Sequence, residues 1–238
     1  MTAKRRLYRD GALADGRSDR LQLGVSILVE DGRITWIRPS DDQGPIPDPG
    51  DVAIVDASGS TIVPGMVDAH SHITMPGGAH WIDRGSDATE VLLDVAEANA
   101  RLLTQAGVRW ARDVGSVTRS DPDDGGRSRA VAIRVRDRWR HRPGYPHVRA
   151  AGTWIMAKGL LPALSVEASN ADELLGAAMT QLDDGADIVK LYLDGPDPGV
   201  SPWTVDELRR VVMAVHDRAC RVTAHTGYLA GARAGAEA

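Results

Sequence analysis

The chain alternates between apolar runs typical of β-strands and amphipathic runs typical of helices along most of its length. Strands are predicted near residues 62–70, 108–114, 148–155, 187–193 and 221–226. Helical spacing of apolar residues fills the intervals, near residues 88–106, 127–140, 171–184 and 204–219. A helix between two strands lets the second strand run parallel to the first. The alternation therefore predicts an α/β fold with about five βα units.

The N-terminal residues follow a different pattern. Residues 25–30 and 33–38 read as two strands joined through Asp31-Gly32, a strong hairpin turn. A linker rich in proline, glycine and aspartate follows at residues 39–51. We therefore expect a small β domain over residues 1–60, as the first part of a composite β-sandwich, and a second domain over residues 61–238.

Two histidines, separated by one residue, lie at the end of the first predicted strand of the second domain. Successive strand residues face opposite ways, so His70 and His72 project together and their imidazoles can converge on one metal ion. Such a pair alone is a weak signal in a chain with seven histidines. Asp68 shares their face and can orient an imidazole. We interpret the strand end as a candidate metal site.

Two later strands carry candidate ligands of the same kind. Lys190 lies inside the apolar run 186–194, where burial disfavours the ammonium form. The neutral amine can then react with carbon dioxide and become a carbamate, an anionic metal ligand. The ordinary alternative is a lysine whose stem packs in the core and whose head reaches water. His225 ends the strand at 221–226, so all the candidates lie where a (β/α) barrel places its catalytic groups.

The ordered set His70, His72, Lys190 and His225 resembles the amidohydrolase superfamily, the relatives of urease, dihydroorotase, imidazolonepropionase and amidohydrolase-type dipeptidases. The chain resembles only the N-terminal part of proteins in that family. The resemblance implies a partial TIM-type (β/α) barrel beside the β-sandwich portion. It implies two divalent ions, expected to be zinc, bridged by carboxylated Lys190. It also implies that metal-activated hydroxide cleaves an amide, cyclic amide or dipeptide-like C–N bond in a small-molecule substrate.

A closed barrel of this type needs about eight strands, more than the pattern supplies before Ala238. The family's pattern adds a histidine on the sixth strand and an aspartate, the general base, on the eighth. No catalytic base is identified in this chain, so that aspartate is expected beyond Ala238. We expect a second polypeptide, or a homo-oligomer, to supply the remaining strands. The alternative is a truncated or degenerate relative acting as a non-catalytic scaffold or interaction protein.

Loops that follow the strands are expected to hold residues that orient ligands or contact the substrate. Judged singly, each of these residues is more often structural. The candidates are Asp68, His80, Asp113, Trp154, Tyr192 and Tyr228.

Two other enzyme classes share part of the pattern. A Schiff-base aldolase would use Lys190 as its nucleophile, but it leaves the histidines unexplained. A single-metal deaminase would use His70, His72 and His225 without the lysine.

Composition limits the partners and the location. The hydrophobic content of 42%, the charged content of 26% and the net charge of -5 are those of an ordinary globular chain. No basic patch with interleaved aromatic residues is present, which argues against nucleic acid. The single cysteine, Cys220, excludes an internal disulfide, and the N-terminus lacks an apolar signal segment. We expect a cytoplasmic protein that associates with neither nucleic acid nor membrane.

Overall fold

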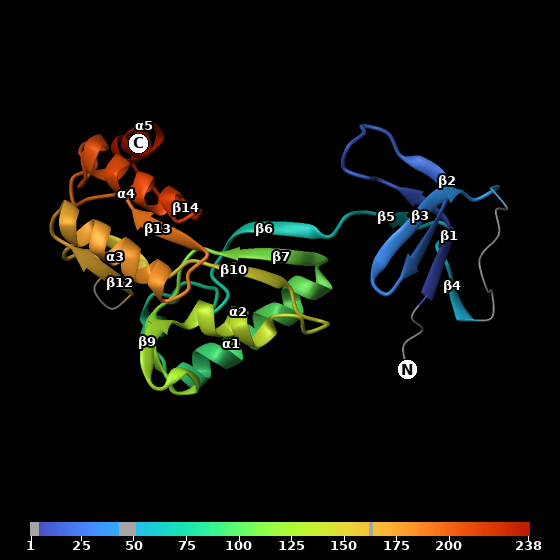
Figure 1. Ribbon diagram of the computed structural model, residues 1–238, viewed down its shortest axis with the longest axis horizontal. Helices are drawn as coiled ribbons and strands as arrows, with labels where there is room; N and C mark the ends of the chain where they lie inside the picture. The colour runs from blue at the N-terminus through green and yellow to red at the C-terminus, as the bar shows by residue number, and fades with distance from the viewer. Residues whose placement is uncertain (1–4, 43–50, 162–163) are drawn as a thin grey trace. The chain divides into compact units, whose positions relative to one another are not determined.

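Figure 1 shows the computed structural model of the chain, which describes residues 5–42, 51–161 and 164–238. Contacts between residues divide the chain into two compact units, Met1–Gly65 and Met66–Ala238. Within the described ranges, no helix combines the length and the apolar character needed to cross a membrane.

The first unit holds a five-stranded sheet with the order β3-β2-β1-β4, in which β5 also pairs with β1 (Figure 1). Its strands are β1 (Arg5–Leu13), β2 (Gln22–Glu30), β3 (Arg33–Pro39), β4 (Val52–Asp56) and β5 (Thr61–Ile62). The predicted hairpin is confirmed, because β2 and β3 pair antiparallel and both Asp31 and Gly32 adopt the positive φ of a tight hairpin turn. Most of the predicted linker, residues 43–50, lies outside the described residues.

The second unit is built on parallel strands whose neighbours follow chain order. These strands are β6 (Met66–Ser71), β7 (Val108–Asp113), β10 (His147–Ala150), β13 (Ile188–Tyr192) and β14 (Arg221–His225). β6, β7 and β10 form one sheet, a parallel bridge from Ala151 to Ile188 continues to β13, and β13 pairs with β14. Two further parallel strands extend this sheet, because β11 (Trp154–Ala157) pairs with β13 and β12 (Ser165–Ala168) pairs with β11. The predicted α/β class is confirmed.

Helices cover one side of these strands. They are α1 (Thr89–Gln105), α2 (Val131–Trp139), α3 (Ala171–Asp183), α4 (Val205–Asp217) and α5 (Leu229–Glu237). α1 and α2 lie along the sheet that contains β7 and β10 (Figure 1). They bury Leu92, Ala96 and Val135 in one cluster with Ala111 of β7. α4 begins with the predicted capping box, in which Thr204 and Glu207 bond reciprocally.

Two predicted elements have different bounds in the structure. The helix predicted over 127–140 begins only at Val131, because Arg127–Ala130 forms β9 and pairs antiparallel with β8 (Thr118–Asp121). The strand predicted over 148–155 divides into β10 and β11, because the backbone N–H of Thr153 donates to the Gln181 side chain between them. Pairing with distant segments thus overrides the local pattern at both places.

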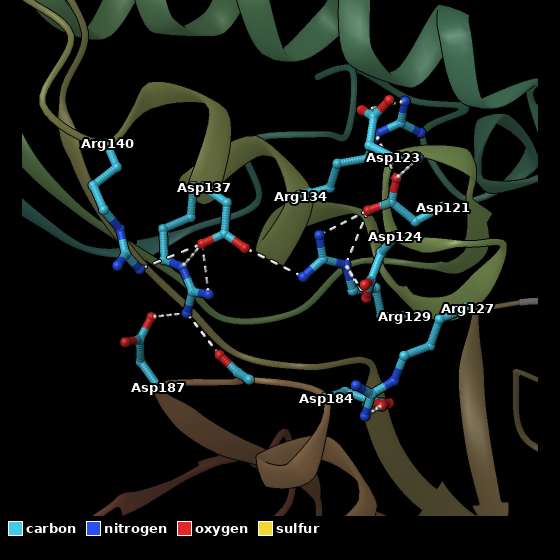
Figure 2. A network of polar contacts seen from close by, with 12 residues as sticks. Asp121, Asp123, Asp124, Arg127, Arg129, Arg134, Asp137, Arg140, Asp184 and Asp187 are labelled. Atoms are coloured by element: carbon cyan, nitrogen blue, oxygen red, sulfur yellow. Dashed lines mark hydrogen bonds and ion pairs between the residues drawn. The ribbon is translucent and has the colours of Figure 1, made fainter.

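A network of arginine–aspartate ion pairs fixes the β8-β9 hairpin to α2 (Figure 2). Asp121 is buried, and its carboxylate lies 2.8 Å from Arg129 and 3.3 Å from Arg134. Arg136 of α2 reaches Asp187, just before β13, at 2.7 Å. The network therefore connects the hairpin, the helix and the start of the next strand.

The outer strands of the second unit have unpaired edges. In the part of the chain that the structure describes, no strand pairs with the outer side of β6 or β14. Met66 and Val67 of β6 are exposed at 50% and 67%, and Trp110 of β7 at 49%. β6 and β14 therefore present unpaired backbone groups along their outer sides, and β6 and β7 present apolar side chains that nothing in the described structure covers.

Candidate active site

The four predicted ligands line one cavity of about 540 Å³ in the second unit. His70 lies on β6, His72 directly after it, Lys190 on β13 and His225 at the end of β14. The carboxyl ends of neighbouring parallel strands lie along one edge of a sheet, so residues far apart in sequence come together there. The histidine rings at positions 70 and 72 have centroids 5.5 Å apart.

His72 has a defined tautomer. Its Nδ1 lies 2.8 Å from the carbonyl oxygen of Gly115, which can only accept, so Nδ1 carries the proton. Burial lowers the pKa of His72, which keeps the imidazole neutral. The lone pair of Nε2 is therefore available to a metal ion or to a substrate proton.

Gly115 occupies a position where a side chain does not fit. Its φ is +132°, and a Cβ added there would lie 2.2 Å from Cδ1 and Nε1 of Trp154. Trp154 also donates from Nε1 to the carbonyl oxygen of Val114. Close contact with Trp154 thus positions the Gly115 carbonyl that binds His72.

Asp113 lies behind this pair. Its carboxylate accepts hydrogen bonds from the backbone N–H groups of Ile73 at 2.7 Å and Gly115 at 2.9 Å. Burial raises the pKa of Asp113 to about 7, against the lowering effect of those two hydrogen bonds. Asp113 therefore connects the segment after β6 to the loop after β7 without itself lining the cavity.

Lys190 is buried with 2% of its surface exposed, and it makes no hydrogen bond or ion pair with any described residue. Its neighbours on the strand, Val189 and Leu191, pack into the core beneath α3 and α4, so the lysine faces the opposite side. Burial, and secondarily the charge of Arg112, lower the pKa of Lys190 to about 8. The neutral amine is therefore more abundant near neutral pH than in an ordinary lysine, and it is available for reaction.

His225 is held by two neighbours. Its ring stacks on Tyr192 with centroids 4.2 Å apart and an interplanar angle of 11°. Its Nε2 lies 3.5 Å from the carboxylate of Asp194. That carboxylate accepts hydrogen bonds from the backbone N–H groups of Gly227 and Tyr228. Burial lowers the pKa of His225, and the charge of Lys190 adds to the effect.

The remaining sequence candidates fall into two groups. Trp154 and Tyr192 line the cavity. The Trp154 and His72 rings meet edge to face, with centroids 5.2 Å apart. Asp68 accepts from the backbone N–H of His70 at 3.0 Å, a bond to the main chain and not to an imidazole. His80 is largely exposed beside Asp83, and Tyr228 is exposed at the start of α5; neither lines the cavity.

The residues that form an apolar wall of the cavity are not among the candidates predicted from the sequence. They are Met75, Trp81, Ile82 and Leu161. These residues lie in irregular segments, where no periodic pattern reveals which side chains point inward. Their only signal is their place after the first and third parallel strands.

Parts of the chain are similar in sequence to an allantoinase and to an adenine deaminase. No family model matches the chain. The allantoinase of Escherichia coli O1:K1 / APEC is 47% identical over 57 residues, which are 24% of this chain and 11% of the relative. The adenine deaminase of Paracoccus denitrificans (strain Pd 1222) is 36% identical over 96 residues, which are 38% of this chain and 15% of the relative.

The fold is also that of a solved Xaa-Pro dipeptidase with methionine bound in its active site. The TM-score is 0.76 at 22% identity, and the match covers 97% of this chain and 59% of that chain. These similarities support membership of the amidohydrolase superfamily over part of the chain. The chain spans only part of the length of the relatives that it matches.

The amidohydrolase superfamily generally depends on divalent metal ions. Among the described residues, no three His, Cys, Asp or Glu side chains lie close enough together to hold an ion. The donor types nevertheless fit a metal ion, since the chain offers imidazoles with lowered pKa values and, in Lys190, a buried amine that has no partner among the described residues. What the set lacks is an anionic ligand, and a lysine supplies one only after carboxylation.

Proposed function

We propose that this chain forms part of a metal-dependent hydrolase that cleaves a C–N bond in a small molecule. The bond is an amide, a cyclic amide or a dipeptide-like bond. The observation that carries the proposal is the single cavity shared by His70, His72, Lys190 and His225. The names of the relatives, which include an allantoinase and a dipeptidase, support this class of bond.

The proposed ligands divide between two ions, with zinc as the proposed metal. His70 and His72 would hold one ion, His225 and a histidine from a further strand would hold the other, and carboxylated Lys190 would be the anionic ligand shared by both. A divalent ion in this place lowers the pKa of water and polarises a substrate carbonyl. The Nδ1–H bond from His72 to Gly115 supports the proposal, because it leaves Nε2 unprotonated.

Other residues of the chain bind the substrate and exclude water. Trp154, Trp81 and Leu161 form an apolar surface next to the histidines, suited to an apolar portion of the substrate. Tyr192 holds the His225 ring by stacking. No aspartate or glutamate of the described residues lines the cavity, so we propose that the proton acceptor is a carboxylate on a further strand.

We propose that the parallel strands belong to a TIM-type (β/α) barrel that a second polypeptide completes. The unpaired outer edges of β6 and β14 support this proposal. In this arrangement residues 61–238 form the barrel portion, and residues 1–60 form part of a composite β-sandwich. The proposed location is the cytoplasm, in keeping with the single free cysteine, Cys220.

Metal content and hydrolysis test the proposal together. The chain is purified with any bound partner, its zinc is measured, and N-acyl amino acids, Xaa-Pro dipeptides and cyclic ureides are offered as substrates. We expect bound zinc and hydrolysis of one of these classes, and we expect His72→Asn to lose both. The control is His216→Asn, on the exposed side of α4, which should keep both. A metal-free, inactive protein would favour the scaffold alternative.

A further inference from the structure

Most arginines on the helix side of the second unit are paired with carboxylates. Figure 2 shows several of these pairs around α2 and the β8-β9 hairpin. The paired arginines include Arg127, Arg129, Arg134, Arg136, Arg138, Arg140, Arg209, Arg210 and Arg218. Much of the positive charge on this side is therefore balanced within the chain.

Three arginines on the strands are different. Arg112 of β7, Arg149 of β10 and Arg221 of β14 are exposed, and none has a carboxylate partner among the described residues. Arg112 donates from Nε to the carbonyl oxygen of Ala69 at 2.7 Å, which satisfies one donor but leaves its charge unbalanced.

The register of the strands places these arginines on one face. Arg149 is the direct partner of Arg112. Ala151, two residues after Arg149, bridges Ile188, and Ile188 is the partner of Arg221. Paired residues of parallel strands and residues two apart share a face. Lys190, two residues after Ile188, therefore lies on this face too, beside the candidate active site.

This face has no covering layer in the described structure. Ala111 of β7 packs into the core under α1 and α2, so Trp110 and Arg112 on either side of it point the other way. Trp110 is 49% exposed and stacks on His147, its partner on β10, with ring centroids 4.5 Å apart. The face thus combines exposed aromatic surface with unbalanced positive charge.

Whatever covers such a face must balance the guanidinium groups. An apolar layer would leave three buried cations without counter-ions, which is strongly unfavourable. A second copy of this chain, applied by the same face, would bring arginines against arginines. Strands that carry carboxylates on their inward side would form ion pairs instead.

We propose that a second polypeptide covers this face with strands that present aspartate or glutamate side chains to Arg112, Arg149 and Arg221. The inference rests on the proposed completion of the barrel and adds the chemistry of the partner. The acidic side chains pair with the arginines below the candidate active site, and the exposed Trp110 packs against the apolar side chains between them. The arginines act as docking residues.

Carbodiimide cross-linking tests the proposal in the complex isolated from the producing organism. The reagent joins an amine directly to a carboxylate but does not react with a guanidinium, so R112K, R149K and R221K each make one docking position reactive while keeping its charge. We expect cross-linked peptides that join these positions to aspartate or glutamate of a second polypeptide. R210K is the matched control and should cross-link to Asp172 of the same chain, the carboxylate 2.7 Å from Arg210.

The outcomes separate this inference from the proposed function. The inference is overturned if R210K cross-links but the three docking positions do not, if they join another copy of this chain, or if no second polypeptide accompanies the chain. A complex that holds zinc and hydrolyses C–N bonds without those cross-links contradicts the acidic partner alone. Cross-links in a metal-free, inactive complex support the acidic partner and contradict the proposed function.

Charge reversal supplies an independent readout. R149E places a carboxylate opposite the proposed acidic strand, so we expect the partner to bind at least about tenfold more weakly. R210E breaks an exposed ion pair on the helix side and should leave partner binding unchanged. Equal binding by R149E and the unmodified chain would overturn the proposal.

Discussion

His72 donates a hydrogen bond from Nδ1 to the carbonyl oxygen of Gly115, 2.8 Å away, and this bond determines which nitrogen of the ring faces the cavity. The two residues belong to segments after different strands, β6 and β7. Asp113 holds these segments together by accepting from the N–H groups of Ile73 and Gly115. The loop after β7 therefore sets the chemistry of a residue that follows β6.

Replacing Gly115 should weaken metal binding. In Gly115→Ala the new Cβ would lie 2.2 Å from Trp154 and would force a positive φ on a residue with a side chain. The carbonyl oxygen then moves away from His72, and we expect metal affinity to fall by about 10- to 100-fold. Gly176→Ala in α3 is the control, since a Cβ there meets nothing within 4 Å and alanine favours a helix. Equal metal affinity in both variants would contradict this role of Gly115.

Asp113 should impose a pH dependence on stability. Its pKa in the folded protein is raised from 3.8 to about 7, so between those values the folded state binds more protons than the unfolded state. The contribution to the free energy of unfolding is complete below about pH 4 and falls by roughly 1.4 kcal/mol for each pH unit as the pH rises toward 7. Denaturant unfolding of the unmodified protein and Asp113→Asn from pH 4 to 8 measures the difference. Parallel curves for the two proteins would show that Asp113 does not titrate in this way.

Lys190 should form a carbamate whose amount depends on pH. Burial and Arg112 lower its pKa to about 8, so the reactive neutral amine increases as the pH rises through that value. In carbon-13 bicarbonate, we expect a carbamate NMR signal that grows between about pH 7 and 9. Arg112→Gln should move this increase to higher pH, because it removes a positive charge near the amine.

Two variants identify the carbamate signal. Lys190→Arg should abolish it, whereas Lys158→Arg, which changes an exposed lysine, should leave it intact. A signal that survives in Lys190→Arg would place the carbamate elsewhere. If metal content and activity also persisted in that variant, a mononuclear site on the three histidines would replace the bridged pair.

The ion pairs around Asp121 should matter far more than those on the open surface. Asp121→Ala leaves Arg129 and Arg134, whose side chains are 16% and 10% exposed, without their buried carboxylate. We expect a loss of about 3 kcal/mol or more in the free energy of unfolding. Asp172→Ala removes the partner of Arg210 at a position where the aspartate side chain is 82% exposed, and the loss should stay below about 1 kcal/mol. Similar losses, measured by denaturant unfolding, would refute a special role for Asp121.

The sequence was sufficient to predict the α/β class and the parallel strands that carry His70, His72, Lys190 and His225, four residues that line one cavity. Strand-end residues in successive βα units share one edge of the sheet, so no knowledge of loop conformation was needed. The arginines at positions 112 and 149 also lie in predicted strands, but their common face follows only from the register between strands.

Features that depend on contacts between loops could not be predicted. The hydrogen bond from His72 to Gly115 joins residues 43 positions apart in the sequence. A periodic pattern of residues describes local structure and cannot predict a contact between such distant positions. Residues 127–130 continue the helical spacing of α2 in the sequence, yet they pair with β8 because Arg129 reaches the buried Asp121. In both cases a contact distant in sequence decides the local conformation.

Native mass spectrometry of the protein, isolated from the producing organism under conditions that keep metals and partners bound, tests the central claim most directly. We predict a complex heavier than one chain that contains a second, different polypeptide and one or two zinc ions, with the zinc lost in His72→Asn. A metal-free single chain that is monodisperse and unfolds cooperatively would contradict both the shared metal site and the need for a partner.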